Sequence, residues 1–174
     1  MLLIEFGTGV QMKTISDKGL KFIQVNEGVA KGSFDGHKFK SYFDKIGNKW
    51  TIAWGLTYIN GKPVTKNTVL TINEANIAFR HHLSSNEKAI NDLMIRDSIV
   101  LTQNEFDALV DFVYNLGNGH ADCDVWKAVK THDFSKIEQA FLAHNKVGGK
   151  YNQGLANRRK KEIALFTQAK YGSY

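Results

Sequence analysis

The first third of the sequence contains two carboxyl groups and one hydroxyl that together could break a glycosidic bond. Glu27 follows an apolar run and precedes Gly28, while Asp44 and Thr51 lie further along among aromatic residues. A carboxyl in an apolar setting stays protonated and can act as an acid, whereas a wetter carboxyl stays ionised and can act on water or on a sugar cation. We expect Glu27 to be the acid and Asp44 the ionised partner, with Thr51 orienting the water.

Aromatic side chains accompany these three residues. Flat apolar faces of this kind pack on sugar rings, and here they come from Tyr42, Phe43, Trp50 and Trp54. Structural roles fit the same positions: Glu27 could end an exposed helix, Asp44 could stabilise a turn, and Thr51 could be an ordinary strand residue. The residue types alone therefore leave both readings open.

The surrounding pattern predicts the elements that would hold this site. Ser16 is a suitable N-cap for a helix that Gly28 ends. Residues 29–39 lack periodicity and read as a loop, whereas residues 40–65 read as short strands. Turn signals within the strand region are Gly47-Asn48 and Asn60-Gly61, and the second is a strong hairpin signal.

Helices dominate after residue 71. Thr71 to Glu74 and Thr102 to Glu105 both have capping-box spacing, and an apolar stripe follows the second until Gly117. Shorter helices are expected near 123–130 and 135–144, and a last helix follows a break at 148–149. The predicted fold is α+β and mostly helical, with a small β-hairpin lobe at about 28–70, a helical lobe at about 71–170, and a ligand cleft between them.

Composition limits the class of protein. The 174 residues are 43% hydrophobic, so the chain is long and apolar enough for one folded domain, placed here at 15–170. Residues 1–14 read as an extension in which Met12 is an alternative start. Met1–Ile4 is too short and uncharged for a signal peptide, and no apolar run is long enough for a transmembrane helix.

Metal and charge signals are modest. Cys123 is the single cysteine, so no intramolecular disulfide can form, and the adjacent His81 and His82 point to different helix faces and make a poor metal site. We expect no metal and no cofactor. The net charge of +6 favours binding to polyanions such as nucleic acids, anionic membranes or bacterial walls. The densest cluster of basic residues, 158–161, fits either a surface that binds a polyanion or a solvated helix face.

Four segments in order resemble one family. They are Asn26-Glu27-Gly28, Tyr42-Phe43-Asp44, the hairpin Trp50-Thr51-Ile52-Ala53-Trp54-Gly55, and the helices at 101–117 and 154–162. Together they are similar to the phage-type lysozymes, the muramidases of glycoside hydrolase family 24. The resemblance spans about residues 15–168 and implies a lysozyme-like fold.

The resemblance also implies the roles of individual residues. Glu27 would be the general acid, Asp44 the base or electrostatic partner, and Thr51 the residue that holds the attacking water. The reaction would be hydrolysis of the β-1,4 bond between N-acetylmuramic acid and N-acetylglucosamine in peptidoglycan, with inversion at the anomeric carbon. Tyr114 matches an aromatic position that faces the cleft, so we expect substrate contacts from Tyr114, together with Trp54 and Tyr42.

Three departures from the family pattern affect the site. Glu27 and Asp44 are 17 positions apart, about twice the family's usual spacing. The segment 29–39 therefore looks like an insertion. Asp35, within it, is an alternative candidate for the second carboxyl. The segment from Asp44 to Thr51 is one residue longer than usual, which predicts a looser turn or a bulge. The third departure is Leu56 after Gly55, where the family often has a histidine, and this change should alter stability more than chemistry. Ala53 also replaces a usual glycine, which predicts a backbone that avoids positive φ.

Three functions compete. The first is a phage endolysin, made in the host cytoplasm and acting on the cell wall after release. It would be a monomer that binds no nucleic acid and does not insert stably into a membrane. A tail-associated wall-degrading domain is a variant of this function. The second is a lytic transglycosylase, which would not need Asp44 or Thr51. The third is a non-catalytic basic module that binds wall polymer or nucleic acid.

Overall fold

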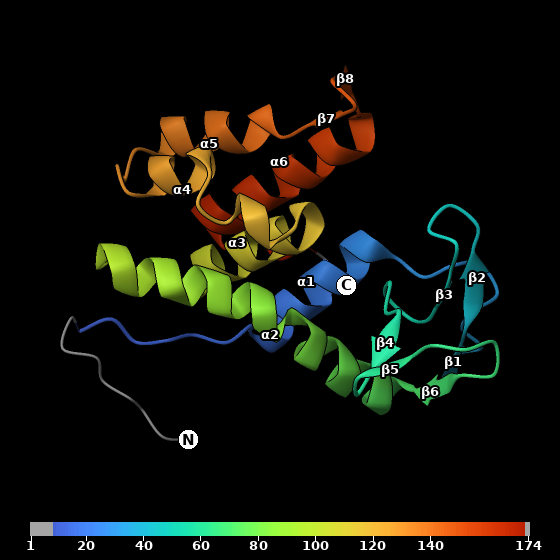
Figure 1. Ribbon diagram of the computed structural model, residues 1–174. Coiled ribbons are helices and arrows are strands. Elements are labelled where there is room, and N and C mark those ends of the chain that lie inside the picture. The colour runs from blue at the N-terminus through green and yellow to red at the C-terminus, as the bar shows by residue number, and fades with distance from the viewer. Residues whose placement is uncertain (1–8, 173–174) are drawn as a thin grey trace. The chain divides into compact units, whose positions relative to one another are not determined.

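The computed structural model describes residues 9–172, which form two compact units (Figure 1). The hairpin unit is Ile23–Leu83, and the helical unit combines the chain up to Phe22 with the chain from Ser84 onward. Helices α1 (Asp17–Glu27) and α2 (Ile72–Asp97) each contribute residues to both units. Among the described residues, no helix has the length and apolarity needed to cross a membrane.

The hairpin unit is built from short antiparallel strand pairs, which Figure 1 shows in cyan and green. In its described part, β1 pairs with β6, β2 with β3, and β4 with β5. The bounds are β1 Lys38–Lys40, β2 Tyr42–Asp44, β3 Lys49–Thr51, β4 Tyr58–Ile59, β5 Lys62–Pro63 and β6 Val69–Thr71. The expected strands between 40 and 65 are confirmed, whereas β1 and β6 were not predicted.

The segment 29–39 is not wholly a loop, as the sequence had suggested. Phe34 forms an isolated antiparallel bridge with Phe39, and their rings stack with centroids 4.5 Å apart. Phe39 is buried and lies on β1, so the segment ends inside the core of the hairpin unit. The prediction of a loop was wrong at residues 38–39, which belong to a strand that pairs with β6. This pairing joins segments far apart in the sequence, so the local pattern of residues could not reveal it.

Two turns of the hairpin unit follow their sequence signals. Asn60 and Gly61 join β4 to β5 with φ of 50° and 76°, the positive values that a two-residue hairpin of this type requires. β2 and β3 are joined by residues 45–48, and every residue of β2 has one partner on β3. The additional residue between Asp44 and Thr51 is therefore accommodated by a looser, four-residue turn and not by a bulge.

The helical unit is centred on α3 (Gln103–Leu116), whose residues from Phe106 to Val113 are all buried. α3 packs on α6 (Gln153–Gln168), and α5 (Phe134–Ala143) packs on both α6 and α4 (Asp124–Val129). The short elements are the 3₁₀ helix η1 (Asn118–His120) and the paired strands β7 (Lys146–Val147) and β8 (Lys150–Tyr151). These helices confirm those expected from the apolar stripes and from the glycines at 117, 148 and 149.

Helix caps follow the predicted signals. Ser16 Oγ accepts a hydrogen bond from Gly19 N at 2.9 Å, which is the N-cap of α1. Thr71 N donates to Glu74 Oε2 at 2.8 Å, and Glu74 N donates back to Thr71 Oγ1 at 3.2 Å. Such reciprocal bonds satisfy donors that a helix start leaves without partners, and each cap contributes about 1 kcal/mol.

Two arginines of the basic cluster do not form a solvated face. Arg158 pairs with Asp111 of α3 at 2.6 Å, and Arg159 pairs with Glu162 at 2.5 Å. Arg159, Asp111 and Glu162 are fully buried, and Arg159 also donates to Asn115 Oδ1 at 2.8 Å. The cluster at 158–161 is therefore divided: its arginines join α3 to α6, and only its lysines are exposed.

Candidate active site

Helix α1 positions Glu27 at its last residue. Gln24, one turn earlier, is buried and donates from Nε2 to Asn76 Oδ1 on α2 at 2.8 Å, a contact within the hairpin unit. Gly28 then takes a φ of 68°, and its N donates to Gln24 O at 3.0 Å, which ends the helix. Glu27 is half-buried at this end of the helix. The sequence predicted that the helix ends here.

The β2–β3 hairpin positions Asp44 and Thr51. The register pairs Tyr42 with Thr51 and Asp44 with Lys49, so these side chains share one face of the hairpin. Phe43 pairs with Trp50 on the opposite face, and their rings meet edge to face at 5.4 Å. Antiparallel pairing thus places the carboxylate and the hydroxyl on the same face, two strand positions apart.

The turn after β2 holds the Asp44 carboxylate. Its Oδ1 accepts a hydrogen bond from Ile46 N at 3.0 Å. A Cβ added at Gly47 would lie 2.7 Å from Asp44 Oδ2, which is closer than non-bonded atoms approach. The observed position of the Asp44 carboxylate therefore requires a residue without a side chain at position 47, which the turn signal alone did not reveal.

Both carboxyl groups affect the pKa of Tyr42. Burial raises the pKa of its hydroxyl above the ordinary value, and the charges of Asp44 and Glu27 raise that pKa further. Both effects disfavour the ionised phenolate. Since Asp44 and Glu27 both act on Tyr42, this side chain lies within the electrostatic reach of both carboxyl groups, and all three residues belong to the hairpin unit.

Thr51 is 5% exposed at the end of β3. Its Oγ1 lies 3.5 Å from Lys49 O, a distance at the limit of hydrogen bonding. In this contact the hydroxyl is the donor, which uses neither lone pair of its oxygen. The Thr51 oxygen can thus accept a hydrogen bond from a water.

Trp54 lies in the core of the hairpin unit. It is 7% exposed, and its ring meets Phe39 at 4.9 Å and Phe79 at 5.4 Å. The expected sugar contact would need an open ring face, and this burial leaves Trp54 a packing role beneath the hairpin. Exposed aromatic surface on the β2–β3 hairpin comes instead from Phe43, on the face away from Asp44.

The expectation for Ala53 was wrong. Its φ is 51°, in the left-handed region, although an alanine there costs about 1 kcal/mol relative to glycine. The bend is fixed by reciprocal backbone hydrogen bonds between Ile52 and Leu56 at 2.9 and 3.0 Å. The buried methyl group of Ala53 offsets part of the strain.

Asp35, the alternative second carboxyl, stabilises a turn in the structure. Its Oδ1 accepts hydrogen bonds from His37 N at 3.0 Å and Lys38 N at 2.8 Å, and these bonds lower its pKa. Asp35 also pairs with Lys40 at 3.6 Å. The charge of Asp44 contributes to the raised pKa of Tyr42. The choice between Asp35 and Asp44 as the second carboxyl remains a prediction.

Tyr114 lies near the C-terminal end of α3 and is half-buried. It belongs to the helical unit, whereas the carboxyl groups belong to the hairpin unit. Its contact with substrate remains a prediction.

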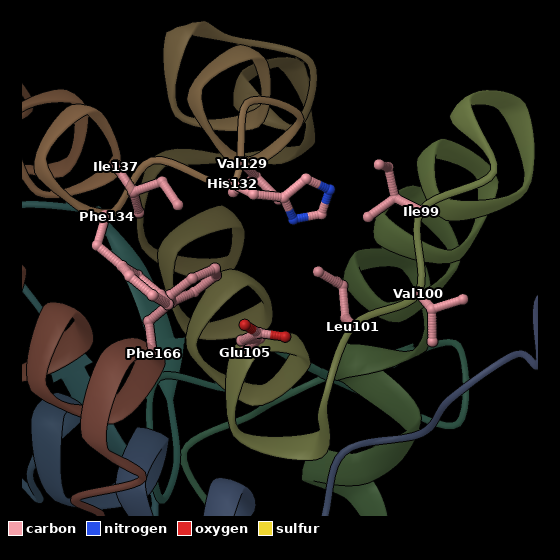
Figure 2. Close-up of a pocket in the computed structure, with 9 residues that line it drawn as sticks. All are labelled: Ile99, Val100, Leu101, Glu105, Val129, His132, Phe134, Ile137 and Phe166. Carbon is pink, nitrogen blue, oxygen red and sulfur yellow. The ribbon is translucent and has the colours of Figure 1, made fainter.

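An apolar pocket in the helical unit is separate from these residues. Figure 2 shows Glu105 and His132 at this pocket, among the side chains of Ile99, Val100, Leu101, Val129, Phe134, Ile137 and Phe166. Glu105 Oε2 accepts a hydrogen bond from Thr102 N at 2.7 Å, so its carboxylate caps α3. Among the described residues that line the pocket, Glu105 is the single acidic one, so this lining does not provide the carboxyl pair that glycosidic cleavage requires.

Known proteins share the order of these elements. An endolysin of Bacillus phage PZA is 32% identical over 154 residues, covering 87% of this chain. The chain spans only 54% of that endolysin. An endolysin from Escherichia coli O157:H7 phage FAHEc1 matches in structure with a TM-score of 0.78 and 28% identity, over 92% of this chain and 98% of that one. A mutant of P22 lysozyme matches with a TM-score of 0.73 and 27% identity, over 89% of this chain and 99% of that one.

A family model described as Phage lysozyme matches residues 32–162, a range that contains Asp44 and Thr51 and begins after Glu27. The match covers well over half of the chain, and the two solved structures above share the fold. On this evidence the chain belongs to the phage lysozyme family.

Proposed function

We propose that this chain is a muramidase of the endolysin type, which hydrolyses the β-1,4 bond between N-acetylmuramic acid and N-acetylglucosamine in peptidoglycan. The observation that carries the proposal is membership of the phage lysozyme family, whose model matches residues 32–162. The carboxyl groups of Glu27 and Asp44 support it, because the charges of both raise the pKa of the Tyr42 hydroxyl. Release from the host cytoplasm to the wall is part of the proposal.

The proposed chemistry assigns one role to each of the three residues. Glu27, half-buried at the end of α1, gives its proton to the glycosidic oxygen as the bond from that oxygen to the anomeric carbon breaks. A water held by Asp44 and Thr51 attacks the anomeric carbon from the opposite face, and its proton passes to Asp44. The product has a free reducing end with inverted configuration.

Tyr42 is proposed to contact the substrate. Its hydroxyl remains protonated because burial and two nearby acids oppose ionisation. A neutral phenol can donate a hydrogen bond to a sugar hydroxyl or acetamido oxygen. Trp54 supports this surface from the core, since it packs on Phe39 and Phe79.

The test is digestion of purified peptidoglycan, with mass spectrometry of the fragments and NMR of the products recorded as soon as they form. Hydrolysis gives fragments with a free reducing end, and NMR reports the inverted anomer before it equilibrates. An anhydro end, lighter by one water, would instead show a lytic transglycosylase. A chain that binds walls but releases no fragments would be a binding module.

Glu27→Gln should lower the rate by about 10²–10⁴-fold, because it removes a general acid. Glu74→Gln is the matched control, since glutamine preserves the capping box in the same unit. Asp44→Asn should also be strongly impaired, whereas Asp35→Asn should retain most activity. If Asp35→Asn is the damaging change, Asp35 and not Asp44 is the second carboxyl.

A further inference from the structure

Three metal-ligating side chains of different types meet in the helical unit, outside the proposed site. They are Cys123, just before α4, Asp124, at its first residue, and His144, just after α5. One ligand atom from each lies within 4.8 Å of the others. His144 is 20% exposed and Asp124 55% exposed in their side chains, so an ion can reach the cluster from solvent.

The distances are close to those of a tetrahedral zinc site. His144 Nε2 lies 3.9 Å from Cys123 Sγ and 2.7 Å from Asp124 Oδ1. Zinc bound by thiolate, imidazole and carboxylate at ordinary bond lengths separates N from S by about 3.5 Å and N from O by about 3.4 Å. These two separations differ from the zinc values by less than 1 Å. The larger difference is in the N–O separation, and rotation of the exposed Asp124 side chain can supply it.

The two less exposed ligands are held in place. The His144 ring meets the buried Phe112 ring edge to face at 5.1 Å, which fixes the imidazole orientation. Val125 N donates to Cys123 Sγ at 3.4 Å, a bond that favours negative charge on sulfur. A second imidazole, His120, lies with its ring centroid 6.1 Å from that of His144. Thiolate, imidazole and carboxylate are each ligand types that Zn²⁺ binds.

A reactive thiol is the other use of a cysteine beside a histidine. Burial raises the pKa of the Cys123 thiol above its ordinary value, and Asp124 raises that pKa further. A nucleophilic cysteine needs the opposite shift. Metal binding is compatible with a thiol because the ion displaces the proton when it binds.

We propose that Cys123, Asp124 and His144 form a binding site for Zn²⁺, with water in the fourth position. The ion would connect the start of α4 to the end of α5. These helices already pack together, so the expected effect is stabilisation of the helical unit. None of the three residues of the site is a proposed catalytic or substrate-contact residue.

The experiment is a titration of the purified full chain with Co²⁺ as a spectroscopic substitute for Zn²⁺. Cys123 is the single cysteine, so a thiolate-to-cobalt charge-transfer band can arise only from this site. We expect the band to saturate at one ion per chain and to disappear on addition of Zn²⁺. Zn²⁺ should also raise the Tm of the chain.

Variants separate this site from other metal-binding surfaces. Cys123→Ser should abolish the band and the Zn²⁺-dependent rise in Tm, and serine should preserve folding because it is a good N-cap. His144→Asn should weaken binding by at least about 10–100-fold. His132→Asn is the matched control: His132 is a histidine of the same unit with φ of 54°, a value that asparagine tolerates.

The proposal is wrong if wild type shows no thiolate band, or if His144→Asn binds Co²⁺ as tightly as wild type. Zn²⁺ stabilisation that persists in Cys123→Ser would place the ion elsewhere and would also contradict it. Digestion of peptidoglycan by Cys123→Ser should equal that of metal-free wild type. Failure of the metal site can therefore be distinguished from failure of the proposed muramidase reaction.

Discussion

At the residue scale, Tyr42 reports on the carboxyl groups around it. Its pKa is raised by burial and by the charges of Asp44 and Glu27. We predict that Asp44→Asn and Glu27→Gln each lower the pKa of Tyr42 toward its ordinary value, because each removes a negative charge. The measurement is an NMR titration of labelled tyrosine, with the Tyr42 signal assigned by comparison with Tyr42→Phe.

Asp35→Asn is the control for that titration and should leave the pKa of Tyr42 unchanged. An effect of Asp35→Asn equal to that of Asp44→Asn would contradict the assignment of Asp44. The raised pKa also has a consequence for stability. The contribution of Tyr42 is fully present below the pKa of an unfolded tyrosine, near 10, and is lost as pH rises through the higher folded pKa.

At the element scale, the turn between β2 and β3 controls the position of the Asp44 carboxylate. A Cβ at Gly47 would lie 2.7 Å from Asp44 Oδ2, so Gly47→Ala must displace that oxygen. We predict a loss of wall digestion of at least about 10-fold, because a misplaced catalytic group loses orientation. The free energy of unfolding should change by less than about 1 kcal/mol, since a flexible side-chain end can move away.

The matched control for Gly47→Ala is Asn48→Gly in the same turn. Asn48 has φ of 50°, so glycine fits its backbone and introduces no atom near Asp44. Digestion rates and thermal unfolding are compared for both variants. Equal loss of activity in the two would show that general loosening of the turn, and not displacement of Asp44, is responsible.

The buried ion pairs between α3 and α6 give a second prediction at this scale. Glu162→Leu should lower the free energy of unfolding by about 3–5 kcal/mol, because Arg159 stays buried without its carboxylate. Adding Arg159→Met should recover most of that loss, since an apolar pair can replace a buried ion pair. Urea unfolding of the two single variants and the double variant forms the cycle, and strictly additive losses would contradict it.

At the scale of the whole molecule, the net charge of +6 should speed encounter with anionic cell walls. We predict that wall digestion falls as salt rises, because the screening length shrinks from about 10 Å at 0.1 M to about 3 Å at 1 M. Hydrolysis of a short uncharged wall oligosaccharide is the control and should vary little. A flat salt profile on intact walls would contradict electrostatic steering.

The surface that provides this steering is smaller than the sequence suggested. Arg158 and Arg159 are neutralised by Asp111 and Glu162, so their charges serve the contact between α3 and α6. The lysines of the cluster, Lys160 and Lys161, are exposed. Charge composition therefore predicts the sign of the salt effect, whereas pairing in three dimensions decides which residues produce it.

The sequence by itself determined the elements whose signals are local. The caps at Ser16 and Thr71, the Asn60-Gly61 turn and the apolar stripe of α3 depend on neighbours a few positions away, so reading along the chain found them. The order of family segments likewise identified Glu27, Asp44 and Thr51 as the candidate residues. Their chemical roles remain proposals.

Only the tertiary structure decided the features that depend on contacts between distant segments. Pairing of β1 with β6 made a strand where the sequence read a loop, and packing on Phe39 and Phe79 buried Trp54. Cys123 and His144 are 21 positions apart and meet because α4 packs on α5. Burial and pairing of this kind come from the folded arrangement of the chain, which no local pattern encodes.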